Sequence, residues 1–180
     1  MLERANIIHI VRHSSGQGLP IGSETDFETF KVFYLDVGLC QAILGSDIST
    51  WFLHPLEGFE NRGEVAESFI GQELVCYADP HSKAEVHFWK RNERSSSAEI
   101  DYLIQRGEAI LPIEVKSGHG STLRSLRLFL DTHPKISTAI RFSSLNYSVL
   151  DKLDSRPLYA AASLAHRSQE QAIRWLVSSP

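Results

Sequence analysis

The sequence predicts an α/β protein in which helices cover a mixed β-sheet. From residue 62 onward the apolar patterns follow the order helix, three strands, helix, strand, which is typical of a single sheet with helices packed on it. The 180 residues are 42% hydrophobic, which is enough to bury a core in one domain. The chain contains no internal repeat that would indicate a solenoid instead.

The first third of the chain predicts a helix that passes into a strand over residues 1–13, because apolar and charged residues are interleaved there. A loop rich in Gly, Ser and Pro follows over residues 14–23. Residues 30–35 are aromatic and β-branched and predict a strand. Residues 36–44 then predict a short helix with Asp36 as its N-cap.

The strongest helix prediction covers residues 62–78, which end at Asp79-Pro80. Glu67 falls at the border of the apolar stripe, and Glu73 falls near its middle, where a solvated Glu is not expected. At about 100° per residue, one face carries Val65, Ala66, Phe69, Ile70, Cys76 and Tyr77.

The second half of the chain is predicted to supply most of the sheet. Strands are expected at 85–90, 98–104, 111–118, 137–142 and 147–150, a polar loop at 91–97, and helices at 121–131 and 169–177. Residues 157–165 fit more than one type of element. The strands 98–104 and 111–118 are expected to pair as a hairpin around residues 105–108.

Composition excludes several functional classes. A net charge of -4 excludes a generally basic nucleic-acid coat, so contacts with phosphates must come from local clusters. Cys40 and Cys76 show no metal-ligand spacing and are typical of a reducing cytoplasm. No signal peptide or membrane span is expected, and the motifs GxxxxGK[ST] and GxSxG are missing. We therefore expect a cytoplasmic protein that neither hydrolyses nucleotides nor carries a serine-hydrolase elbow.

Charged residues interrupt the two strands that should form the hairpin. Glu114 and Lys116 alternate with Ile113 and Val115, and pairing of the strands can bring Asp101 beside Glu114. Two carboxylates and an ammonium can hold a divalent metal and a water next to a phosphate. The alternative is a plain ion pair between Glu114 and Lys116 at a strand end, with Asp101 solvated.

These motifs resemble those of a known superfamily. Ile100-Asp101, the later Glu114-Val115-Lys116 and the preceding helix with Glu67 resemble the PD-(D/E)XK nuclease superfamily, with Ile100 in the place of proline. Together with residues 30–39 (FKVFYLDVGL), they resemble more narrowly an uncharacterised domain. That domain lies C-terminal to the AAA+ ATPase module in many bacterial and archaeal proteins. The resemblance covers roughly residues 25–150.

The resemblance implies an αβββαβ core of the restriction-endonuclease type, with an N-terminal extension. It implies that Asp101 and Glu114 bind Mg²⁺ or Mn²⁺, that Lys116 positions the attacking water, and that Glu67 is a third acidic contributor. Glu73 is the rival of Glu67 for the last role. Residues 25–180 would form the nuclease-like domain, and residues 1–24 a segment left from the linker to a missing ATPase module.

Basic residues outside these motifs suggest where nucleic acid would bind. Arg124 and Arg127 lie one turn apart on the predicted helix 121–131, and Arg91 lies between Lys90 and Arg94 in the polar loop. Such residues can contact phosphates. The alternative is that they are ordinary solvated side chains.

Two functions from different classes therefore remain open. One is a Mg²⁺-dependent nuclease that hydrolyses phosphodiester bonds in DNA. The other is a catalytically inactive module of the same fold that binds DNA or protein beside an ATPase. Self-association through residues 1–24 or binding of another protein is expected in either case, and binding to a membrane is not.

Overall fold

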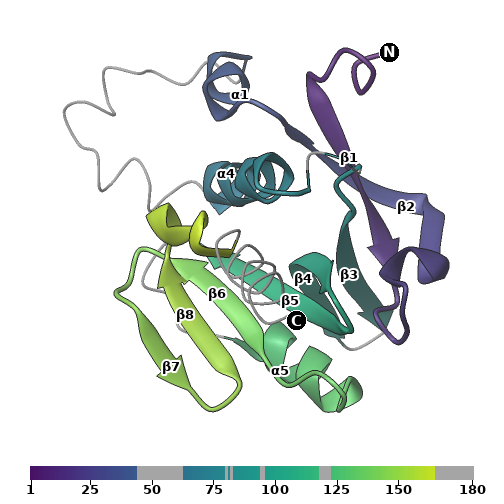
Figure 1. The fold of residues 1–180 in the computed structure, drawn as a ribbon, viewed down its shortest axis with the longest axis vertical. Coiled ribbons are helices and arrows are strands. Elements are labelled where there is room, and N and C mark those ends of the chain that lie inside the picture. Colours follow the sequence, from purple (N-terminus) through teal and green to yellow (C-terminus); the bar gives the residue numbers. More distant parts are fainter. Residues whose placement is uncertain (44–62, 80, 82, 94–95, 118–122, 165–180) are drawn as a thin grey trace, which may run out of the picture.

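The computed structural model shows one eight-stranded mixed sheet with helices on both faces (Figure 1). The structure describes residues 1–43, 63–79, 81, 83–93, 96–117 and 123–164. The strands are β1 (Ile8–Ser14), β2 (Thr25–Tyr34), β3 (Val86–Glu93), β4 (Ser96–Arg106), β5 (Ala109–Lys116), β6 (Ala139–Ser143), β7 (Ser148–Leu150) and β8 (Leu153–Pro157). The helices are η1 (Ile21–Glu24), α1 (Val37–Ile43), α4 (Gly63–Cys76), α5 (Arg124–Thr132) and η2 (Leu158–Ala160).

The strands lie in the order β2-β1-β3-β4-β5-β6-β8-β7. The hairpin predicted from the sequence is present: β4 and β5 are antiparallel and are joined at Gly107, whose φ of +55° is favourable only for glycine or a few polar residues. β5, β6 and β8 run parallel to one another, and α5 lies in the connection from β5 to β6. The predicted order of helix, three strands, helix, strand is therefore confirmed from α4 to β6.

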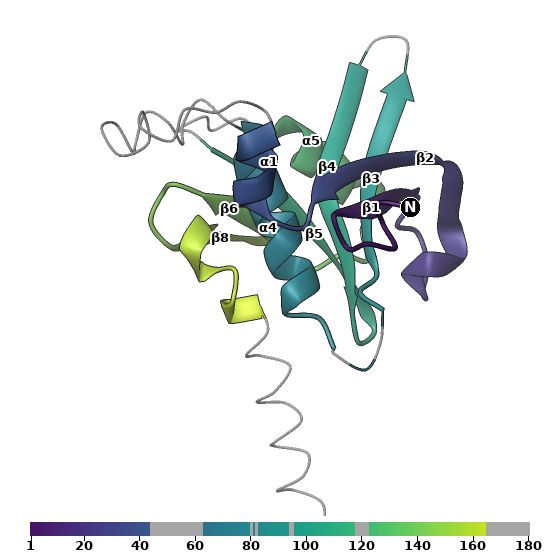
Figure 2. The same cartoon turned by 90° about the horizontal axis from the view of Figure 1, so that it is seen from above.

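Each face of the sheet has its own apolar core. α4 covers one face and α5 the other, as Figure 2 shows. The α4 side is built from Ala66 and Ile70 together with Ile113, Val115 and other strand residues. The α5 side contains Leu126 and Phe129 with residues such as Trp89 and Ile100. Alternation along β5 therefore directs Glu114 and Lys116 away from α4.

A β-bulge lies at the centre of the sheet. His87 pairs with Leu103 and Trp89 pairs with Ile100, so two residues of β4, Asp101 and Tyr102, lie opposite one residue of β3. On the other side of β4, pairing with β5 begins only at Tyr102. Asp101 therefore lies where β4 and β5 separate, and its side chain can reach the backbone of β5.

The helix predictions for the N-terminal half are largely confirmed. α1 begins after Asp36, whose Oδ1 accepts a hydrogen bond from the Leu39 N–H at 2.6 Å, as expected of an N-cap. α4 agrees with the predicted helix over residues 62–78. The predicted helix at the start of the chain is wrong: residues 2–6 form turns, and Asn6 ends them with a φ of +53° before β1 begins. β1 lies inside the sheet, between β2 and β3.

In the second half, one prediction is wrong and one strand was not predicted. The polar loop expected at 91–97 is largely strand, because β3 and β4 continue as a hairpin in which Asn92 pairs with Ser97. β8 was not predicted as a strand, because Asp154 and Arg156 make its sequence polar although both are buried. The remaining strands and α5 agree with the predictions to within a few residues. The helix predicted at 169–177 lies outside the described residues.

Among the helices that the structure describes, none combines the length and the apolar character needed to cross a membrane.

Candidate functional site

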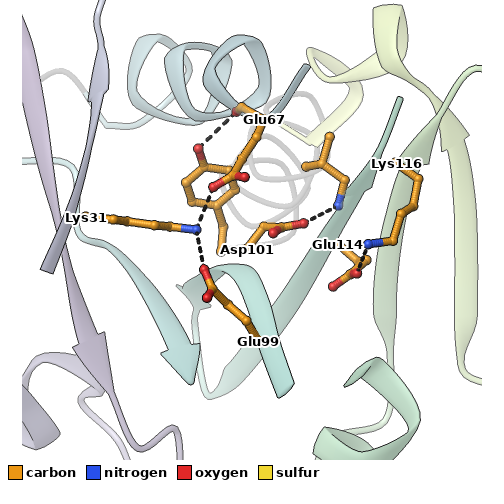
Figure 3. A network of polar contacts seen from close by, with 8 residues as sticks. Lys31, Glu67, Glu99, Asp101, Glu114 and Lys116 are labelled. Atoms are coloured by element: carbon orange, nitrogen blue, oxygen red, sulfur yellow. Dashed lines mark hydrogen bonds and ion pairs between the residues drawn. The ribbon is translucent and has the colours of Figure 1, made fainter. Parts of the chain in front are cut away.

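The candidate site is centred on Asp101, at the point where β4 and β5 separate (Figure 3). Its Oδ2 accepts a hydrogen bond from the Val115 N–H at 2.7 Å. Burial raises the pKa of Asp101 to about 8, and the negative charges of Glu114 and Glu67 contribute to this rise. Lys31 and the Val115 hydrogen bond act in the opposite direction. Without a bound cation, Asp101 therefore holds a proton at neutral pH.

Glu114 enters the site from β5 and is only 3% exposed. Its Oε1 lies 2.5 Å from the Nζ of Lys116, whereas its Oε2 is buried and has no hydrogen-bond partner. Burial raises the pKa of Glu114, although the hydrogen bond and charge of Lys116 oppose the rise. A buried carboxylate oxygen without a partner is unusual in a folded protein. This oxygen is therefore available to a ligand.

Lys116 is the half-buried cation of the pair. Burial by itself would lower the pKa of Lys116, but the hydrogen bond to Glu114 and the charges of Glu114, Asp101 and Glu67 outweigh it, so that the pKa is raised. Lys116 therefore carries its charge at neutral pH. Its position two residues after Glu114 places both side chains on the same face of β5.

Glu67 reaches the site from α4, on the opposite side of the sheet from Glu114. Its Oε1 lies 2.6 Å from the Nζ of Lys31, a residue of β2. Its backbone carbonyl accepts a hydrogen bond from the Tyr102 hydroxyl at 2.9 Å, which ties α4 to the bulge in β4. Of the two glutamates that the sequence offered on α4, Glu67 is the one that contacts this network.

Lys31 and Glu99 were not predicted as site residues. The ammonium of Lys31 lies 3.3 Å from Glu99 Oε1 and about 5 Å from the ring centres of Phe88 and Tyr102. Burial alone would lower the pKa of Lys31, but Glu67, Asp101 and Glu99 raise it overall. The signal for Lys31 was present in the sequence, since a lysine interrupts the apolar strand FKVFYL just as Glu114 interrupts β5.

The donor set suits a small, hard cation. Four carboxyl groups, those of Glu67, Glu99, Asp101 and Glu114, face only two ammonium groups, those of Lys31 and Lys116, in the network of Figure 3. The described residues contain no group of three or more His, Cys, Asp or Glu side chains arranged to hold a metal ion. A cation here would therefore depend on one or two carboxylates and on water, which is the coordination that Mg²⁺ commonly adopts.

The three arginines predicted to contact nucleic acid lie on α5 and on β3. Arg124 and Arg127 are exposed on α5, and neither belongs to the network drawn in Figure 3. Arg91 lies on β3, opposite Ala98, in the part of the hairpin that was expected to be a loop. The structure therefore brings together Glu67, Asp101, Glu114 and Lys116, and it places Arg124 and Arg127 on the helix that covers the face of the sheet to which Glu114 and Lys116 project.

Comparison with known proteins identifies the family to which the chain belongs. No curated protein matches the chain. A family model described as a domain of unknown function, DUF4143, matches residues 62–159, which is more than half of the chain and includes α4 and strands β3 to β8. The match contains the four residues predicted for metal binding and catalysis, Glu67, Asp101, Glu114 and Lys116. The chain therefore belongs to the DUF4143 family.

Proposed function

We propose that this protein is a metal-dependent nuclease that hydrolyses phosphodiester bonds in DNA. The observation that carries the proposal is the unpartnered, buried Oε2 of Glu114 beside Asp101 and Lys116. A buried acceptor that the protein leaves unsatisfied, within an excess of carboxyl groups, favours a bound cation. The resemblance of the three residues to the PD-(D/E)XK motif supports the same proposal.

Asp101 and Glu114 would hold the cation, with Mg²⁺ or Mn²⁺ as the expected metal. Such an ion supplies a Lewis acid that neutralises charge on the scissile phosphate and lowers the pKa of a bound water. Asp101 must release its proton to bind the cation, because its pKa is about 8 without one. The backbone N–H of Val115 fixes one oxygen of that carboxylate in place.

Lys116 would act as a fixed positive charge and hydrogen-bond donor. Its raised pKa argues against a role as a general base, which would require the neutral amine at neutral pH. A charged ammonium can instead orient the attacking water or stabilise the negative charge that develops in the transition state. Glu114 holds this ammonium at 2.5 Å and so links the metal ligand to the lysine.

Glu67 would influence Asp101 through its charge, from its position on α4. Because its own carboxylate is bound by Lys31, it contributes negative charge to the centre while its position is fixed by an ion pair. Tyr102 fixes the backbone of the same residue. Glu67, Lys31 and Tyr102 therefore hold α4 and the acidic end of β4 in one arrangement.

The test is cleavage of fluorescently labelled single- and double-stranded DNA with Mg²⁺ or Mn²⁺. We expect Asp101→Asn and Lys116→Met to lower the rate by at least about 100-fold, as the loss of a metal ligand or of a preorganised charge does. Lys135→Met, at an exposed position, is the matched control and should keep the rate of the wild type. Equal rates in all four proteins would rule out the catalytic assignment.

A second candidate is a catalytically inactive module that binds DNA or protein, in keeping with the resemblance of residues 30–39 to a domain found beside AAA+ ATPases. The lack of a three-ligand metal cluster in the described part of the chain favours it. Isothermal titration with Mn²⁺ distinguishes the two: a nuclease site should bind Mn²⁺ in the wild type and lose it in Asp101→Asn. A module without a metal site should show no binding in either protein.

A further inference from the structure

Arg141 is a cation next to the proposed metal site that no motif in the sequence singles out. It lies on β6 in register with Glu114 of the neighbouring parallel strand β5. Its neighbours Ile140 and Phe142 pack in the core beneath α4, as Ile113 does on β5. The side chain of Arg141 therefore projects to the same face of the sheet as Glu114, from a strand about 4.8 Å away.

Glu114 and Arg141 each leave one buried polar atom unsatisfied. Oε2 of Glu114 and Nε of Arg141 are both buried and lack a hydrogen-bond partner in the structure. Buried polar atoms are nearly always paired, and an arginine keeps its charge at any physiological pH. One of these atoms is an acceptor that a cation would satisfy, and the other is a donor that an anion would satisfy.

We propose that Arg141 binds a phosphate group of the DNA substrate, beside the cation held by Asp101 and Glu114. This inference rests on the proposed function and identifies the residue that contacts the anion. A metal-bound phosphodiester provides both missing partners at once, because its metal satisfies Glu114 and its oxygen satisfies Arg141. The planar guanidinium suits phosphate oxygens, and Lys116 supplies a second positive charge on the same face.

The competing explanation is that Arg141 and Glu114 form an internal ion pair that only supports the fold. In that case the loss of Arg141 would lower the free energy of unfolding and leave the affinity for DNA unchanged. The two explanations therefore predict different affinities of Arg141→Met for DNA.

The experiment measures the Kd of a fluorescein-labelled oligothymidylate by fluorescence anisotropy in Ca²⁺, which takes oxygen ligands. Arg141→Met should raise the Kd about 10- to 100-fold, as expected for the loss of one charge-assisted hydrogen bond, and Arg141→Lys should raise it less. Lys135→Met, which removes an exposed cation outside the candidate site, is the matched control and should bind like the wild type. The Kd for Mn²⁺, measured by calorimetry, should not change in Arg141→Met.

Equal Kd values for wild type and Arg141→Met overturn the inference, whatever the cleavage assay gives, and so does a wild type that binds no oligonucleotide. Binding that depends on Arg141 without cleavage supports the inference and overturns the nuclease activity. If Arg141→Met does not fold, chemical modification of the wild type decides. Oligonucleotide with Ca²⁺ should protect Arg141 from phenylglyoxal in peptide mass spectra, and unchanged modification contradicts the inference.

Discussion

Asp101 shows at the scale of one residue how the site affects the whole fold. Its pKa is raised from 3.8 to about 8 by burial and by neighbouring carboxylates, so the folded state holds a proton that the unfolded state releases above about pH 4. The folded state therefore loses stability as the pH rises from about 4 to about 8. Below pH 4 both states are protonated and the effect is absent.

We therefore predict that Asp101→Asn flattens this dependence and raises the free energy of unfolding at pH 7. The measurement is urea unfolding at several values between pH 5 and pH 8, without divalent cations. Asp131→Asn, at an exposed position on α5, is the control and should leave the profile of the wild type unchanged. Parallel profiles for wild type and Asp101→Asn would show that Asp101 does not carry the proton.

Glu114, Asp101 and Lys116 could be predicted from the sequence because ionisable residues in apolar strands are conspicuous on their own strand. Arg141 could not be predicted as a site residue, because it becomes a candidate only through its register with Glu114. The local sequence does not determine the register between β5 and β6. Glu99 has the same limitation: the sequence shows a Glu two residues before Asp101, but only the fold brings Lys31 to it.

At the scale of elements, the close approach of α4 to the sheet decides where Glu67 lies. A Cβ atom on Gly71 would lie 2.5 Å from the Tyr102 hydroxyl oxygen and 3.0 Å from the ring of Phe33. The Tyr102 hydroxyl is the group that binds the backbone carbonyl of Glu67. Gly71 is therefore required for packing, although alanine has the higher helix propensity.

Gly71→Ala should lower the free energy of unfolding by about 1–3 kcal/mol, the usual cost of overpacking a core. Gly63→Ala is the matched control on the same helix, because its Cβ would come no closer than 3.7 Å to the Ser117 hydroxyl oxygen. Chemical denaturation of both variants gives the comparison. A stabilised Gly71→Ala would mean that α4 is not in contact with Tyr102.

The elements themselves were predicted well where their apolar pattern was regular, as in α4, β4 and β5. β8 was not predicted, since Asp154 and Arg156 are buried as an ion pair with an N–O distance of 2.5 Å. A loop was expected at residues 91–97 because their sequence is polar, but β3 and β4 continue there as a ladder that extends beyond the neighbouring strands (Figure 2). In that ladder Asn92 pairs with Ser97, and Glu93 pairs with Ser96.

At the scale of the whole molecule, a cation at the site should stabilise the fold. A ligand that binds only the folded state adds about 1.4 kcal/mol when its concentration is ten times its Kd. We predict that Mg²⁺ raises the Tm of the wild type at pH 7, where it must displace the proton of Asp101.

The measurement is a thermal melt with and without Mg²⁺, compared with Asp101→Asn and Glu114→Gln. Both variants should lose the shift, and Glu3→Gln, at a residue of the distant ion pair with Lys83, should keep it. A shift of equal size in all four proteins would indicate that Mg²⁺ binds elsewhere.

The apolar core on the α5 side of the sheet affects how relatives of this protein can be recognised from their sequences. Ile100 is fully buried on the α5 side, and it pairs with Trp89 in the ladder between β3 and β4. Packing and backbone pairing therefore determine the residue before Asp101, whereas Asp101 itself belongs to the candidate site. A motif search that requires proline at the position of Ile100 would miss this protein, because a buried aliphatic residue occupies that position. A search for a buried aliphatic residue followed by Asp suits the protein better.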